Sequence, residues 1–285
     1  MKFIKIFLLN FIFFAFPFPA CACRIHSNRP QTPPSVTAQI HYLSLPTDAT
    51  AEQLNAPPRP AFWNDEHVDV SNVDPKRKLI AFTFDDAPST TLENLLALYA
   101  SFNESNPDCP ATATFFVNGY RFDNHVAPFF HVANAMQMEL GNHTYSHLDL
   151  TKQTDKKIRD EIKKTDEILQ RFDGKTLHLI RTPFGNCNEK IKELSKTPLI
   201  NWTIDTLDWQ GKKADEIYDT VWKNKSDGSI VLMHDGYEET VSAVKRLLPD
   251  LKNAGYQVVG VSQLAKANGC QLKTGSVYIR ARKQR

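Results

Sequence analysis

The sequence predicts an α/β fold with about seven parallel strands, on three observations. From residue 78 onward, short apolar runs alternate with helical segments, as in proteins whose parallel strands are joined by helices. The chain has 285 residues and is 41% hydrophobic, which is enough to bury a core. Polar clusters follow several apolar runs, as functional loops do at the carboxyl ends of parallel strands. A parallel α/β barrel and a doubly wound sheet both satisfy these observations.

The expected elements alternate along the chain. Strands are predicted from apolar runs at 79–84, 113–117, 139–142, 177–181, 199–204, 229–234 and 257–261. Helices are predicted at 91–102, 126–136, 155–172, 189–196, 215–223 and 239–254. The helix from Asp155 is the clearest, because Ile158, Ile162, Ile168 and Leu169 form an apolar stripe on a charged surface.

Residues 1–23 have the pattern of an export signal. Lys2 and Lys5 precede an apolar run, and prolines and small residues follow it. Cleavage near the end of this segment is the main interpretation. A lipoprotein leader, with Cys21 or Cys23 lipidated, and an uncleaved anchor are the alternatives, and both would attach the chain to a membrane. Each version predicts export, to the periplasm, the cell envelope or the medium.

Composition divides the rest of the chain into three parts. Residues 24–74 are rich in proline and predict a spacer, residues 75–270 carry the alternating elements, and residues 271–285 form a basic tail without acidic residues. The tail is expected to be a solvated terminus, or alternatively to contact an acidic polymer. The whole chain has 34 basic and 32 acidic residues, and no nucleic-acid-binding motif is found, so no nucleic-acid partner is expected.

Three cysteines follow the leader region: Cys109, Cys187 and Cys270. An odd number is unusual for an oxidising compartment, and at most one pair can form a disulfide. The sequence leaves open which pair that would be. The spacing of the three residues excludes a zinc ribbon.

The first chemical motifs suggest a metal site. Asp85 and Asp86 close the first strand, and two adjacent carboxylates there are costly unless a cation or an arginine is near. His143 and His147 are four residues apart, a spacing that suits a Zn²⁺-type ion, and Asp86 would complete an Asp-His-His set. The alternatives are a turn with a helix-capping Asp and a chance pair of surface histidines. Three further histidines lack this context and are expected to be structural or exposed: His125, His131 and His178.

The remaining motifs suggest acid–base chemistry. Arg181 ends a predicted strand, where it can pair with a base carboxylate and hold it ionised, or form a purely structural salt bridge. Asp208 and His234 are interpreted together, because a carboxylate beside an imidazole raises its pKa and fixes its ring. Trp209 and Leu232 would line an apolar pocket, the alternative being an ordinary core Trp and a satisfied His.

In this order, the five motifs resemble those of the polysaccharide deacetylase family, the NodB homology domain of carbohydrate esterase family 4. The motifs are Thr83–Asp86, His143–His147, Arg181–Gly185, Asp205–Trp209 and Leu232–His234, and the resemblance covers roughly residues 75–268. It implies a distorted (β/α) barrel and hydrolysis of the acetamide of N-acetylated sugars.

The resemblance also implies a role for each matching position. Asp85 matches the general base, Arg181 the residue that tethers it, His234 the general acid and Asp208 its partner. The metal ligands are matched by Asp86, His143 and His147, and the substrate-binding positions by Phe184, Trp209 and Leu232. Phe184 stands where the family often has Tyr, and its backbone N–H is the implied oxyanion donor.

One departure from the family pattern concerns Ala87, because the family usually has glycine after the Asp pair. Alanine tolerates positive φ poorly, so either the loop has negative φ there or it is shifted. The departure leaves the metal ligand Asp86 in place.

The sequence therefore predicts an exported enzyme that releases acetate from a polysaccharide, most specifically from the N-acetylglucosamine of peptidoglycan. Chitin oligomers and an exopolysaccharide are alternative substrates, and O-acetyl xylan ranks below them. A small-amide hydrolase and a carbohydrate-binding pseudoenzyme are the alternative functions. The expected cofactor is a divalent metal, with Zn²⁺ favoured and Co²⁺ or another ion as the alternative.

Overall fold

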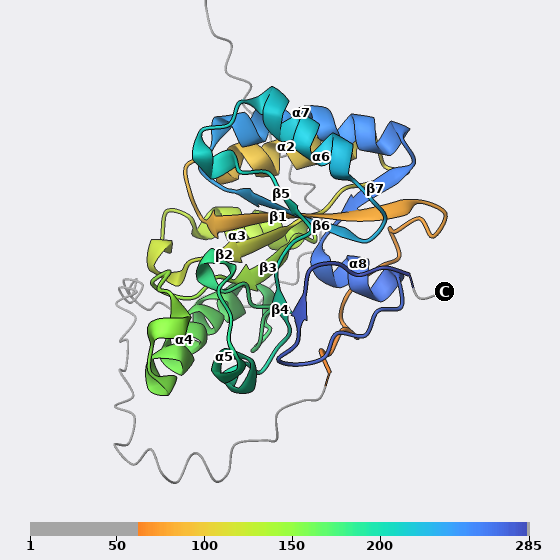
Figure 1. Cartoon of the computed structure of the whole chain (residues 1–285). Helices are drawn as coiled ribbons and strands as arrows, with labels where there is room; N and C mark the ends of the chain where they lie inside the picture. The colour runs from red at the N-terminus through yellow and green to blue at the C-terminus, as the bar shows by residue number, and fades with distance from the viewer. Residues whose placement is uncertain (1–61, 284–285) are drawn as a thin grey trace, which may run out of the picture. The chain divides into compact units, whose positions relative to one another are not determined.

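The computed structural model describes residues 62–283 (Figure 1). The expected leader at 1–23, with Cys21 and Cys23, and most of the proline-rich segment lie outside the described residues. Within them, no helix combines the length and the apolar character needed to cross a membrane. Cys109, Cys187 and Cys270 are all free, so no pair among them forms a disulfide.

A six-stranded parallel sheet forms the centre of the fold, which confirms the predicted α/β class (Figure 1). Its longest strand, β1 (Lys78–Ala87), pairs with β6 along one edge. Along the other edge, the first half of β1 pairs with β7 and the second half with β2. The sheet order is β3 (Glu139–Asn142), β2 (Thr114–Val117), β1, β6 (Ser229–His234) and β5 (Ile204–Asp205), with β7 (Tyr256–Val259) beside β1.

The six predicted helices are confirmed, and they flank the sheet. Their bounds are α2 (Leu92–Ser105), α3 (Ala127–Ala135), α4 (Asp155–Asp173), α5 (Glu189–Leu194), α6 (Ala214–Asn224) and α7 (Glu238–Asn253). In Figure 1, α2, α6 and α7 lie together on one side of the sheet. The helix α8 (Val261–Ala267) was not predicted, because its short sequence directly continues the apolar run of β7.

Two of the predicted strands do not form as single strands in the structure. The run 199–204 forms two short strands, β4 (Leu199–Ile200) and β5, which pair with different partners. The run 177–181 is reduced to bridges at Ile180, which pairs with Asn142 on one side and with Leu199 on the other. The neighbouring strands β3 and β4 have only four and two residues, so this segment finds bridging partners at Ile180 alone.

The basic tail is also more ordered than expected. Residues Val277–Tyr278 form β8, which pairs with β4, and Leu272 and Ala281 are buried. The tail also contacts the first described residues of the chain: the backbone N–H of Trp63 donates to Leu272 O at 2.8 Å. The expectation of a wholly solvated terminus is therefore wrong for residues 272–281.

Alternation along β1 separates its apolar residues into two cores. Ile80, Phe82 and Phe84 belong to a large cluster, whereas Leu79 and Ala81 belong to a second cluster on the opposite face. This is the period of two expected for a strand that is buried on both faces. Thr83 and Asp85 continue the second face, so the same periodicity directs two polar side chains toward the interior beside an apolar core.

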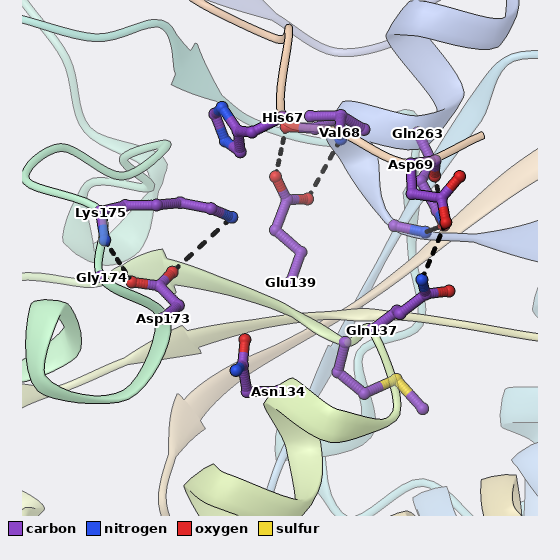
Figure 2. A pocket seen from close by; sticks show the side chains of 13 residues that line it. His67, Val68, Asp69, Asn134, Gln137, Glu139, Asp173, Gly174, Lys175 and Gln263 are labelled. Atoms are coloured by element: carbon purple, nitrogen blue, oxygen red, sulfur yellow. Dashed lines mark hydrogen bonds and ion pairs between the residues drawn. The ribbon is translucent and has the colours of Figure 1, made fainter. Parts of the chain in front are cut away.

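A polar pocket of about 390 Å³ lies beside the amino-terminal end of β3 (Figure 2). Glu139 accepts hydrogen bonds from the backbone N–H of Ser262 at 3.1 Å and from Thr114 Oγ1 at 2.6 Å. Lys175 forms an ion pair with Asp173 at 3.7 Å. The hydrogen bonds of Glu139 join β3 to segments that are distant in sequence.

We expect Gly141→Ala to lower the free energy of unfolding by about 1–3 kcal/mol, the cost of overpacking a core. A Cβ atom at Gly141 would lie 2.5 Å from Phe116 Cδ1, inside β3 where the backbone cannot retreat. Urea denaturation measures the change. In a Phe116→Leu background the same substitution should cost less, because the smaller side chain leaves room; an equal cost in both backgrounds would contradict the steric explanation.

Candidate active site

The polar motifs of the sequence meet at the edge of the sheet formed by the carboxyl ends of its parallel strands. The strands β1 and β6 are in register at Asp85 and His234. His143 directly follows β3, and its backbone N–H donates to Val117 O at the end of β2. Two 3₁₀ turns complete this edge, η3 (Pro183–Gly185) after Arg181 and η4 (Asp208–Gln210) after β5.

Three of these side chains form a candidate metal centre. One ligand atom from each of Asp86, His143 and His147 lies within 4.8 Å of the other two. Asp86 Oδ1 is 3.8 Å from His143 Nε2 and 3.7 Å from His147 Nε2. These distances are too long for hydrogen bonds, but atoms that each lie about 2.0–2.2 Å from a shared ion can be this far apart.

The hydrogen bonds around the triad fit a cation. His143 Nδ1 lies 2.7 Å from Arg181 O and must donate to that carbonyl, which leaves the Nε2 lone pair directed at the centre. Asp86 Oδ1 is buried and has no hydrogen-bond partner, a costly state for a carboxylate oxygen without a cation. Burial and the neighbouring His143 lower the pKa of His147, which favours the neutral imidazole that a metal requires.

The carboxylate next to the triad is held by a buried arginine. Arg181 Nη1 lies 2.7 Å from Asp85 Oδ1, and both residues are almost inaccessible to solvent. Burial alone would raise the pKa of Asp85, but the charges of Arg181, His143 and His234 outweigh it and hold the pKa below its usual value. Asp85 is therefore ionised, and its other oxygen, Oδ2, lies 3.6 Å from His143 Nε2 at the metal centre.

The guanidinium of Arg181 is fixed by further contacts that sequence reasoning did not identify. Its Nη1 also donates to Thr83 Oγ1 at 2.7 Å, and its Nε donates to Ile200 O at 3.0 Å. Its Cζ lies 4.2 Å from the centroid of the Phe116 ring, a cation–π distance. Thr83 belongs to the same face of β1 as Asp85, and that alternation is the signal in the sequence that could have identified it.

On the other side of the site, Asp208 holds His234. The carboxylate Oδ1 is 2.7 Å from His234 Nδ1, while Oδ2 accepts hydrogen bonds from the His234 backbone N–H and from Thr240 Oγ1, both at 2.8 Å. Burial opposes protonation of the imidazole, yet the hydrogen bond to Asp208 and the charges of Asp85 and Asp208 raise the pKa of His234. With Nδ1 engaged, Nε2 is the nitrogen left to exchange a proton with a substrate.

The three predicted substrate-binding residues differ in exposure. Phe184 and Trp209 are 63% and 52% exposed, whereas Leu232 is only 3% exposed within β6. The Phe184 ring packs edge-on against His147 with the centroids 4.8 Å apart, so it lies at the rim of the metal centre. Their roles in substrate binding remain predictions. Tyr237, which was not predicted, lies edge-on to His234 with a centroid distance of 6.2 Å.

The loop at Ala87 has its positive φ at the preceding residue, Asp86. Among the described residues, positive φ occurs at Asp86, at 64°, and not at Ala87. The pairing of β1 with β2 is irregular between Phe84 and Ala87, so the strand is bulged at the Asp pair. Ala87 is consequently unstrained in a buried position, and the departure from glycine leaves the metal centre intact.

A second set of residues supports the loop that carries His143 and His147. Asn142 precedes His143 and donates from Nδ2 to Asp166 Oδ1 at 2.8 Å, while its Oδ1 accepts from the Thr144 backbone N–H at 2.8 Å. Asp166 in turn lies 2.9 Å from His178 Nδ1. His178 is thus a buried structural residue, and His125 and His131 are exposed, as the sequence predicted.

The sequence of the chain is similar to those of known polysaccharide deacetylases. The family model described as polysaccharide deacetylase matches residues 72–199. The peptidoglycan-N-acetylmuramic acid deacetylase PdaC of Bacillus subtilis is 32% identical over 192 residues, which cover 67% of this chain and 40% of PdaC. A peptidoglycan-N-acetylglucosamine deacetylase of Bacillus cereus is 34% identical over 200 residues, which cover 66% of this chain and 89% of that protein.

Solved structures give the same result. The T48 deacetylase with substrate aligns with a TM-score of 0.66 and 32% identity, over 72% of this chain and 99% of that one. A family 4 acetyl xylan esterase from Clostridium thermocellum, in complex with a cobalt ion, aligns with a TM-score of 0.64 and 25% identity, over 71% of this chain and 98% of that one. The resemblance inferred from the five motifs is thereby confirmed, and the chain belongs to the polysaccharide deacetylase family.

Proposed function

We propose that this chain is a metal-dependent polysaccharide N-deacetylase that releases acetate from the N-acetylglucosamine of peptidoglycan. The observation that carries the proposal is the placement of an ionised carboxylate and a protonatable imidazole at one Asp-His-His centre. Asp85 and His234 are register partners on adjacent strands, and each has its own fixed partner, Arg181 and Asp208. A base and an acid whose surroundings push their pKa values in opposite directions are what amide hydrolysis requires.

A divalent ion held by Asp86, His143 and His147 would supply Lewis-acid polarisation of the acyl carbonyl and of a water molecule. Asp85 accepts a proton from that water as the new C–O bond forms. His234 donates a proton from Nε2 to the amide nitrogen as the C–N bond breaks, so acetate and a free amine leave. Arg181 keeps Asp85 ionised, and Asp208 holds the imidazole in the orientation that leaves Nε2 free.

Zn²⁺ is the ion we favour, because two imidazoles and one carboxylate are typical of catalytic zinc sites with open positions. The Clostridium thermocellum structure holds cobalt, which supports Co²⁺ as the alternative. An Asp-His-His set accepts several divalent ions, and the ion bound in the cell then depends on availability.

The preference for peptidoglycan is supported by the names of the two relatives and by the expected export signal. We place the protein outside the cytoplasm on the strength of residues 1–23, with attachment to the membrane as the alternative to secretion. Chitin oligomers, an exopolysaccharide and O-acetyl xylan remain alternative substrates. The small-amide hydrolase and the binding-only pseudoenzyme are less well supported, since every catalytic position carries a residue with the required chemistry.

We also infer that the sheet closes as a distorted (β/α) barrel. Two observations support this. The Ile200 backbone N–H donates to Ile180 O at 2.8 Å, and Ile180 bridges Asn142 at the end of β3. Farther along the same segment, the Thr203 backbone N–H donates to Ile230 O in β6 at 3.0 Å. The segment 199–205 would thus join the two ends of the sheet.

The direct test is acetate release from peptidoglycan and from N-acetylglucosamine oligomers. We expect a chelator to abolish release and Zn²⁺ to restore it. His143→Ala should lose the bound metal as well as activity, because it removes a ligand from a three-residue set, and metal content per chain is measured by elemental analysis. Acetate release that survives complete metal removal would refute the metal-dependent mechanism.

We expect Asp85→Asn to lower kcat by roughly 100-fold or more, the contribution typical of a general base, while metal content stays unchanged. Asparagine keeps an oxygen for Arg181 but cannot accept the proton. Steady-state kinetics and elemental analysis measure the two effects. Asp219→Asn, on the exposed face of α6, is the matched control and should leave both unchanged. Full turnover in Asp85→Asn would exclude Asp85 as the base.

We expect kcat/KM to fall as the pH rises through the pKa of His234, because only the imidazolium can donate a proton. This pKa is raised by Asp208, so Asp208→Asn should lower it and move the alkaline limb of the profile to lower pH. A pH–rate profile of both proteins measures the shift. An alkaline limb at the same pH in both would show that His234 is not the group that titrates.

A further inference from the structure

A shallow depression of about 490 Å³ borders the metal centre. Its lining residues are Pro88, Ser89, Thr90, Tyr120, Arg121 and Val126. Pro88 is two residues from the ligand Asp86. The turn η1 (Gly119–Arg121) is hydrogen-bonded to the loop between the two histidine ligands, through the Gly119 N–H to Thr144 O at 3.1 Å and the Tyr120 N–H to Tyr145 O at 2.9 Å. The depression is therefore adjacent to the loop that carries His143 and His147.

Arg121 is the charged residue of the depression, and most of its hydrogen-bonding capacity is unused. Its Nε donates to Tyr120 OH at 3.0 Å, and its Cζ lies 5.5 Å from the centroid of the Tyr120 ring. Within residues 62–283, no carboxylate lies within ion-pair distance of its guanidinium. A guanidinium has five N–H donors, so Arg121 retains the paired donors that bind a carboxylate in two parallel hydrogen bonds.

The acidic groups near Arg121 are already engaged. Asp235 is buried and accepts hydrogen bonds from the Ser89 N–H at 2.6 Å and from Thr91 Oγ1 at 2.7 Å. Asp123 accepts from the backbone N–H groups of His125 and Val126. Asp86 faces the two histidines of the metal centre.

We propose that this depression is a subsite for a carboxylate-bearing substituent of the glycan, with the guanidinium of Arg121 as its ligand. The proposal rests on the proposed function and narrows it to N-acetylated glycans that carry an acid beside the reacting sugar. The lactyl ether of a muramic acid residue is such a group where it carries no stem peptide, since the peptide is attached through an amide of that carboxyl; chitin has no such group. Tyr120, which is 50% exposed, offers an aromatic face for the adjoining sugar ring.

The test compares two forms of one glycan with the full chain. Alternating N-acetylglucosamine–N-acetylmuramic acid oligomers are used with their lactyl carboxylates free or capped as methyl amides. We expect kcat/KM for acetate release to be about tenfold higher for the free acid, the gain typical of a charge-assisted hydrogen bond. In Arg121→Gln this ratio should fall to about one, and Arg121→Lys should restore part of it. Arg159→Gln, which removes an exposed arginine on α4, should keep the wild-type ratio.

A binding measurement separates this inference from the proposed function. The dissociation constants of the free-acid and capped oligomers are measured by calorimetry for the wild type and for Arg121→Gln. If no oligomer releases acetate but the free acid binds more tightly in an Arg121-dependent manner, the subsite stands and the deacetylase proposal fails. If acetate is released from both forms at equal kcat/KM, or the ratio is unchanged in Arg121→Gln, the subsite is refuted and the deacetylase proposal stands.

Discussion

The rest of the site depends on the buried ion pair between Arg181 and Asp85. Two charges removed from water are tolerated only when the pair and the surrounding hydrogen bonds compensate for the lost hydration, and removing one partner of such a pair typically costs about 3–5 kcal/mol. Here Arg181 bonds Asp85 and Thr83 on β1 and the carbonyls of Ile200 and Asn201 on another segment. One side chain thus fixes the position of the Asp85 carboxylate and holds together the strand ends that surround it.

The second constraint is the change of backbone direction at Asp86. In a regular strand Asp85 and Asp86 would point to opposite faces, and only one could reach the metal centre. The bulge in β1 and the positive φ of Asp86 bring both carboxylates to within 3.8 Å of His143 Nε2. Positive φ also occurs at Thr144, His147, Phe184 and Leu207, all in the motif loops. Positive φ costs free energy in residues other than glycine, and it persists only where surrounding contacts hold the backbone in place. The hydrogen bonds of Asn142 and Arg181 supply such contacts here.

The sequence was sufficient to predict what local patterns encode. The helices, the parallel sheet and the five motifs at strand ends follow from periodicity and from the position of polar residues after apolar runs. It failed where long-range pairing decides the structure. The run 199–204 splits because each half finds a different partner, and Val277–Tyr278 become a strand only because β4 is beside them. The supporting roles of Asn142 and Asp166, and the contact of Asp166 with His178, were not predicted for the same reason, since these contacts join segments more than ten residues apart.

The centre and the rim of the site are held by different kinds of interaction. Asp85, His143, Arg181 and Asp208 are buried, and each is hydrogen-bonded to other residues of the site or of its supporting strands, so a change in one disturbs its neighbours. Phe184, Trp209 and Tyr237 are exposed at the rim, and Arg121 makes a single hydrogen bond through its guanidinium. Substitutions at the rim therefore alter an exposed surface and leave the buried hydrogen bonds around the candidate metal centre in place. The proposed contacts with a glycan fall on these exposed rim residues, where the surface is least constrained by the fold.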